Sequence, residues 1–111
     1  MSALALALAL ALPAAVAEPW RAVKGSALHA LFSDKEFADG VHFAYQLRRD
    51  GTFTGTEMGK TVSGTWRVAG DRLCWRWQRP PGPRECYDVQ QDGANIRLLI
   101  NGSEAWYGAL K

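Results

Sequence analysis

The side chains that most often bind metals or carry redox chemistry are few in this chain. Its two histidines, His29 and His42, stand far apart in the sequence, and neither belongs to a local metal-ligand spacing. The two cysteines, Cys74 and Cys86, lack the Cys-x-x-Cys spacing of a zinc or redox site. We therefore predict ordinary surface histidines, a structural disulfide, no metal and no cofactor.

One carboxylate, Glu57, is a candidate acid, because the alternation of its strand places it on the inward face beside a turn at Gly59. A carboxylate at the end of a strand is usually solvated, and no paired carboxylate supports the alternative of an acid with a raised pKa. Four serines lack the context of an activated nucleophile: Ser26, Ser33, Ser63 and Ser103. We predict no catalytic residue and no enzyme.

A group of arginine side chains is the strongest candidate for a binding surface in this sequence. The group is Arg67, Arg72, Arg76, Arg79 and Arg84, with Trp77 near the same proline-rich loop as an aromatic anchor. One interpretation is a solvated face that aids solubility. The other is an interaction patch for an acidic protein, a glycan or a lipid head group. The formal net charge of +2 is too small to indicate nucleic acid as the partner.

These arginines lie in a stretch that alternates apolar and polar residues on both sides of Gly70-Asp71. Such alternation is typical of strands with one buried face. A two-residue turn at Gly70-Asp71 pairs Val68 with Leu73 and Trp66 with Trp75, so both apolar sets fall on one face.

The next hairpin sets the cysteine register. If Cys74 lies opposite Cys86, Arg76 faces Arg84 and the apolar residues again share one face. Directly opposed antiparallel residues bring two Cα atoms within the ~4.4–6.8 Å that a disulfide needs. Closing so short a loop contributes about 3 kcal/mol in the chain-entropy model. Like charges directly opposed destabilise a sheet, so the arginine pair favours splayed side chains or an anionic partner.

Turn signals recur along the chain and predict a meander of short strands. The expected strands are 41–48, 52–58, 61–68, 72–78, 85–90, 95–100 and 104–109. A two-residue turn at Gly59-Lys60 pairs Phe53 with Trp66. Such a large apolar face must curl on itself, so we predict a mainly β fold, an antiparallel up-and-down barrel of seven to eight strands.

The last hairpin allows two registers. A two-residue turn at Asn101-Gly102 turns Ala105 and Tyr107 inward, whereas a three-residue turn turns Trp106 inward. We favour Trp106 inside, because a tryptophan gains more free energy from burial.

Residues 1–17 form an apolar run that ends in Ala15-Val16-Ala17. This pattern is typical of a secretory signal peptide cleaved after Ala17, and the run is too short to span about 30 Å of hydrocarbon. We expect residues 18–111 to form one domain that is periplasmic or secreted, with no transmembrane segment after cleavage.

Between this leader and the strands we expect a short helix capped by Ser26 and ending at Phe32. Ser33 and Glu36 have the spacing of a capping box, which starts a second helical turn or reorients the chain. The segment near Trp20 looks extended and is a candidate to complete the barrel.

The order of these features resembles a loosely defined group of short exported bacterial proteins of unknown function, lipocalin-like in outline. The motifs that carry the resemblance are GTF at Gly51, GTWRV at Gly64, GDRLC at Gly70 and CYDV at Cys86. It covers about residues 25–100 and implies a small exported barrel. It implies no functional residue.

Three functions stay open. A non-enzymatic binding or protein-interaction module is our main prediction, a small secreted inhibitor of a hydrolase is the second, and a lipocalin-like carrier of an apolar molecule is the third. The inhibitor hypothesis depends on the loop 79–84 or the arm 18–23. The carrier needs a cavity, although sixteen mostly large side chains are assigned to the interior.

Overall fold

The computed structural model describes residues 19–111, so the predicted leader and its cleavage site lie outside the described residues. One helix, α1, spans Ser26–Phe32. The strands are β1 (Arg21–Val23), β2 (Lys35–Ala38), β3 (Phe43–Leu47), β4 (Thr52–Glu57), β5 (Lys60–Ala69), β6 (Arg72–Arg79), β7 (Pro81–Asp92), β8 (Asn95–Ile100) and β9 (Ser103–Leu110). In this part of the chain, no helix is long and apolar enough to cross a membrane.

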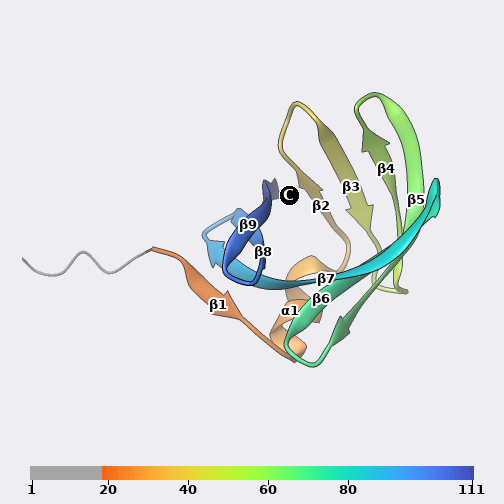
Figure 1. Ribbon diagram of the computed structural model, residues 1–111. Helices are drawn as coiled ribbons and strands as arrows, with labels where there is room; N and C mark the ends of the chain where they lie inside the picture. The colour runs from red at the N-terminus through yellow and green to blue at the C-terminus, as the bar shows by residue number, and fades with distance from the viewer. Residues whose placement is uncertain (1–18) are drawn as a thin grey trace, which may run out of the picture.

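The eight strands β2 to β9 form a closed antiparallel barrel (Figure 1). Each strand pairs with the next along the chain, and β9 returns to β2 through the pairs Phe37–Leu110 and Ala38–Ala109. The predicted up-and-down barrel is confirmed. The strand that completes it is β2, whereas the segment after Trp20 forms β1, which pairs with the second half of β7 as an additional strand.

The capping-box motif at Ser33 starts a strand and not a second helical turn. The Ser33 hydroxyl donates back to the carbonyl oxygen of His29 at 2.6 Å, and Asp34 takes a left-handed backbone with φ of 60°. The chain therefore leaves the helix at once, and Phe37 enters the core with no exposed area. At the other end, Gly25 and not Ser26 occupies the N-cap position of α1, and no side chain caps the helix.

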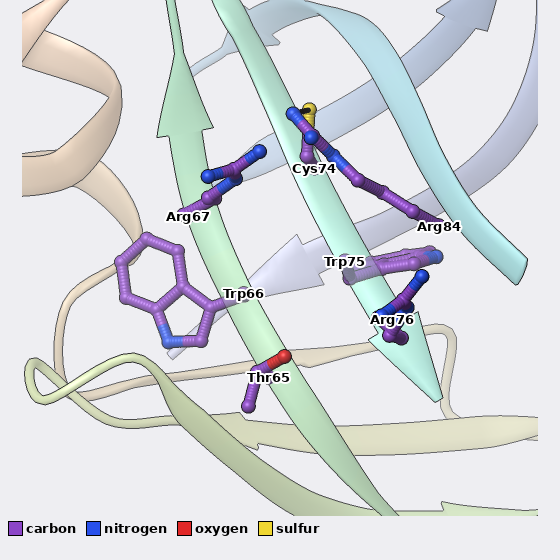
Figure 2. Close-up of a pocket in the computed structure, with 7 residues that line it drawn as sticks. All are labelled: Thr65, Trp66, Arg67, Cys74, Trp75, Arg76 and Arg84. Atoms are coloured by element: carbon purple, nitrogen blue, oxygen red, sulfur yellow. Dashed lines mark hydrogen bonds between the residues drawn. The ribbon is translucent and has the colours of Figure 1, made fainter. Parts of the chain in front are cut away.

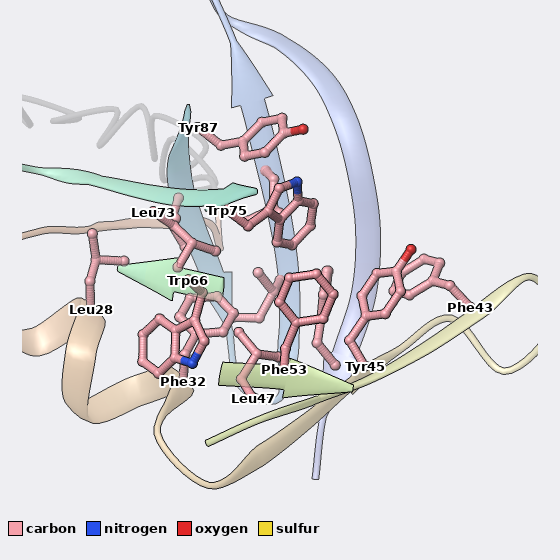
Figure 3. Close-up of a cluster of buried hydrophobic side chains, with 14 of the residues drawn as sticks. Leu28, Phe32, Phe43, Tyr45, Leu47, Phe53, Trp66, Leu73, Trp75 and Tyr87 are labelled. Atoms are coloured by element: carbon pink, nitrogen blue, oxygen red, sulfur yellow. The ribbon is translucent and has the colours of Figure 1, made fainter. Parts of the chain in front are cut away.

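The helix covers one end of the barrel, at the foot of Figure 1. Leu28 and Phe32 are fully buried there, and α1 packs against β2 and β5. His29 stacks on Trp66 with ring centroids 5.3 Å apart, while the Trp66 indole donates to the carbonyl oxygen of Arg48 at 2.7 Å. This end of the core is thus sealed by apolar packing, as Figure 3 shows for Leu28, Phe32 and Trp66.

The hairpin of β4 and β5 corrects one predicted register. Its turn is Met58-Gly59, so Phe53 faces Gly64 instead of Trp66. The reason is steric, because a Cβ atom on Gly64 would stand 2.5 Å from the ring of Phe53. Only glycine leaves room for this ring on the inward face.

The last hairpin combines the two registers that the sequence left open. Its turn has two residues, since Ile100 pairs with Ser103, yet Leu98 pairs with Trp106. A β-bulge between Leu98 and Leu99 shifts the register by one residue. Trp106 therefore packs against the core, and Tyr107 is exposed.

Candidate functional site

A pocket of about 340 Å³ lies on the outer face of β5, β6 and β7 (Figure 2). We call it the arginine pocket. It is lined by Thr65, Trp66, Arg67, Cys74, Trp75, Arg76 and Arg84. The side chains of Trp66 and Trp75 are only 3% exposed and pack in the barrel core, so the reachable polar groups are those of the outward residues.

Strand register gathers these outward residues. Arg67 lies opposite Cys74, and Arg76 lies opposite both Thr65 and Arg84, so alternate residues of three strands meet on one face. The predicted disulfide is confirmed: Cys74 and Cys86 are bonded and lie directly opposite each other on β6 and β7. This bond ties β6 to β7 under the pocket and limits how far the strands can separate.

The guanidinium groups of the pocket lack carboxylate partners. Among residues 19–111, no ion pair involves Arg67, Arg76 or Arg84. Arg84 donates from Nη2 to the sulfur of Cys74 at 3.5 Å, which is a weak interaction. The pocket thus presents three cations with most of their hydrogen-bond donors free, which is the chemistry of an anion site.

The other residues of the predicted patch, Arg72, Trp77 and Arg79, do not line the arginine pocket. Arg72 pairs with Asp88 at 3.3 Å on the same outer face. Arg79 ends β6 and does not line the pocket. Trp77 packs inward, with its ring 5.4 Å from Tyr45 and 5.5 Å from Phe53, so the structure separates it from the arginines.

A group of aromatic side chains, with two carboxylates beside them, lies inside the barrel, away from the end that α1 covers. We call this region the aromatic mouth. It comprises Phe43, Tyr45, Phe53, Trp75, Trp77, Tyr87 and Trp106, with the carboxylates Glu57 and Glu85. Glu57 is partly buried opposite Phe43, on the inward face as predicted. Burial, followed by the charge of Glu57, raises the pKa of the Tyr45 hydroxyl far above 10.0.

Glu85 is a residue that the sequence analysis missed. It lies opposite Trp75 on the inward face of β7 and accepts a hydrogen bond from the hydroxyl of Tyr87. That hydroxyl in turn accepts one from the Trp106 indole at 3.2 Å. Burial and the bond to Glu85 raise the pKa of Tyr87. The signal was available, because Glu85 stands two residues before Tyr87 and shares its face.

Neither histidine side chain belongs to the arginine pocket or to the aromatic mouth. His42 pairs with Asp39 at 2.7 Å in the loop between β2 and β3, and His29 stacks on Trp66 beside α1. Although desolvation raises the pKa of Asp39, backbone hydrogen bonds from Val41, Phe43 and His42 outweigh it and hold that pKa well below its ordinary range. Within the described residues, no three His, Cys, Asp or Glu side chains are placed to hold a metal ion.

Comparison with known proteins identifies no relative. No protein-family model matches the chain, and searches of curated proteins and of solved structures return no significant match. The barrel outline agrees with the resemblance described above, and the comparisons add nothing on export or on a lipocalin relationship.

Proposed function

We propose that the protein is an exported, non-enzymatic binding module that holds an anionic group in the arginine pocket. The observation that carries the proposal is the convergence of Arg67, Arg76 and Arg84 on one cavity without a carboxylate partner in the described chain. The partner is an acidic protein, a glycan or a lipid head group, which share phosphate, sulfate or carboxylate chemistry.

The physical argument is that the opposed arginines repel each other when no anion is bound. Arg76 and Arg84 are directly opposed on neighbouring strands, where like charges destabilise a sheet. A bound oxyanion removes this repulsion and accepts several charge-assisted hydrogen bonds at once. The guanidinium groups stay protonated at any physiological pH, so they suit binding and cannot act as general bases.

Two features support export. The first 17 residues have the pattern of a secretory leader, and the disulfide is of a kind that persists in oxidising compartments. Nothing in residues 19–111 favours the hydrolase-inhibitor hypothesis over an anion-binding module.

The proposal is tested with three anionic probes that separate the sources of the anion. These are a sulfated heparin hexasaccharide, a hexaglutamate peptide, and phosphatidylglycerol vesicles compared with phosphatidylcholine vesicles. Binding is measured by calorimetry or sedimentation for the wild type and for Arg76→Glu/Arg84→Glu. We expect at least one probe to bind, and the variant to weaken that binding about tenfold or more.

The matched control is Arg21→Glu/Arg49→Glu, which changes the net charge equally at exposed positions outside the pocket. If the control weakens binding as much as the pocket variant, attraction by net charge alone explains the result and the proposal fails. It also fails if none of the probes binds.

A further inference from the structure

Trp106 fills a slot in the aromatic mouth whose walls are other aromatic rings. Its ring centroid stands 5.0 Å from that of Phe43, 5.4 Å from that of Trp75 and 5.9 Å from that of Tyr45. All three contacts are edge-to-face, an arrangement that aromatic rings favour. Trp106 is nevertheless only partly buried, so the slot reaches the surface.

Two hydrogen-bond donors beside this slot make no hydrogen bond of ordinary distance and angle within the described chain. They are the buried hydroxyl of Tyr45 and the buried indole nitrogen of Trp75. The Glu57 carboxylate is the acceptor beside the Tyr45 hydroxyl, and the Tyr87 hydroxyl is the acceptor beside the Trp75 indole. The two residues are 2% and 3% exposed. In Figure 3 the polar atoms of Tyr45, Trp75 and Tyr87 point away from Leu28 and Phe32, which seal the other end of the core. Unpaired buried donors are rare, because each loses its hydrogen bonds to water without compensation.

Trp106 fits the slot by shape and only partly by hydrogen bonding. Its indole donates to Tyr87, and an indole nitrogen cannot accept. Trp106 therefore cannot accept a hydrogen bond from Tyr45 or from Trp75. A planar ring that carries an acceptor atom matches these walls better than Trp106 does.

Trp106 lies in the part of β9 that precedes its pairing with β2. β9 pairs with β2 through Ala109 and Leu110, and Lys111 extends this pairing by exchanging two backbone hydrogen bonds with Glu36. On the other side, the bulge disturbs the β8 ladder next to Trp106. The side chain can thus leave the slot at the cost of one side-chain hydrogen bond, to Tyr87, and its ring contacts.

We propose that Trp106 is a displaceable plug, and that the aromatic mouth binds a neutral planar aromatic molecule whose acceptor oxygen or nitrogen receives hydrogen bonds from Tyr45 and Trp75. The carboxylates Glu57 and Glu85 belong to the same region and disfavour an anionic ring. This site is distinct from the arginine pocket in position, in charge and in ligand, and it does not depend on the anion proposal.

The first test opens the slot with Trp106→Ala and compares three probes by calorimetry. Coumarin is a neutral planar ring with acceptor oxygens, naphthalene has no polar atom, and indole offers a donor alone. We expect coumarin to bind the variant about tenfold more tightly than the other two. Adding Tyr45→Phe, which deletes one donor, should reduce that preference severalfold. Trp20→Ala removes a partly buried tryptophan that makes an edge-to-face contact with Tyr107 outside the slot, and it should bind coumarin as the wild type does.

The second test uses the wild type, so it stands even if Trp106→Ala does not fold. With ¹⁵N-labelled tryptophan, saturating coumarin should move the indole resonance of Trp106 and shift that of Trp75 downfield as its N–H gains an acceptor. Unchanged Trp75 and Trp106 resonances would overturn the proposal that the ligand displaces Trp106. Equal affinity of coumarin and naphthalene for Trp106→Ala, or no effect of Tyr45→Phe, would overturn the role of the acceptor.

Discussion

One strand, β6, supplies alternate residues to two contrasting regions. Cys74 and Arg76 point outward into the arginine pocket, while Trp75 and Trp77 point inward to the aromatic mouth. The pocket leaves charges unpaired next to water, where solvation keeps the cost of each small. The mouth leaves the Tyr45 hydroxyl and the Trp75 indole without a hydrogen bond of ordinary geometry in the barrel interior, where each missing hydrogen bond costs about 1–3 kcal/mol. Unsatisfied groups are therefore rarer inside, and more informative about a missing partner.

The disulfide under the pocket gives the largest expected effect. Cys74→Ala/Cys86→Ala should lower the free energy of unfolding by about 3 kcal/mol, because the unfolded chain regains the entropy of an open loop. Urea denaturation followed by tryptophan fluorescence measures the change, and reduction of the wild type should reproduce it. We expect the double variant to lose anion affinity, while the aromatic mouth, held by its own ring contacts, keeps its indole resonances. Simultaneous loss of both would show that the two regions share one support.

Removing the hydroxyl from each of two tyrosines of the aromatic mouth should give changes in the free energy of unfolding of intermediate size. The two changes should differ in sign. Tyr87→Phe should destabilise the protein by about 1–2 kcal/mol, since it strands Glu85 and the Trp106 indole. Tyr45→Phe should be neutral or stabilise by up to about 1 kcal/mol, since it deletes a buried hydroxyl that makes no hydrogen bond of ordinary geometry in the described chain. Both values come from urea titrations at neutral pH. Equal losses for the two variants would mean that the Tyr45 hydroxyl is already satisfied.

The opposed arginines give the smallest effect. Arg76→Gln should stabilise the ligand-free protein by about 0.2–1 kcal/mol at low salt, because it removes a like charge from opposite Arg84. The gain should disappear near 1 M salt, where the Debye length is about 3 Å. Arg67→Gln is the control, because Arg67 faces Cys74 and not another cation. A gain that persists in high salt would point to packing and not to charge.

The predictions from sequence were most accurate where two independent signals agreed. The turn at Gly70-Asp71 and the pairing of Cys74 with Cys86 each satisfied both turn chemistry and the alternation of apolar residues, and both registers are confirmed. The turn between β4 and β5 was predicted at Gly59-Lys60 but lies at Met58-Gly59. This difference shifts the strand register by two residues, which leaves every side chain on the same face of the sheet. Alternation alone cannot detect such a shift.

The missed and misplaced elements depended on contacts between distant segments. β2 has four residues and follows a sequence that resembles a helix start, so only the burial of Phe37 against the barrel reveals it as a strand. Of the five arginines in the predicted patch, Arg72 is paired with Asp88, and the bulge after Arg76 separates Arg79 from the pocket. Strand register and neighbouring carboxylates decide which arginines converge on the pocket. Neither can be deduced from the amino-acid composition.

The junction of β2 with β9 has a consequence for the order of folding. It pairs Phe37 with Leu110, so the barrel cannot close until the chain has been synthesised as far as Leu110. The consecutive hairpins are local and can assemble early, whereas this pairing carries a large loop-closure entropy and is expected to come late. Until then β2 and β9 present unpaired edges, which are templates for joining another copy. Delayed docking of these two short edges is therefore the step at which this barrel is most exposed to aggregation.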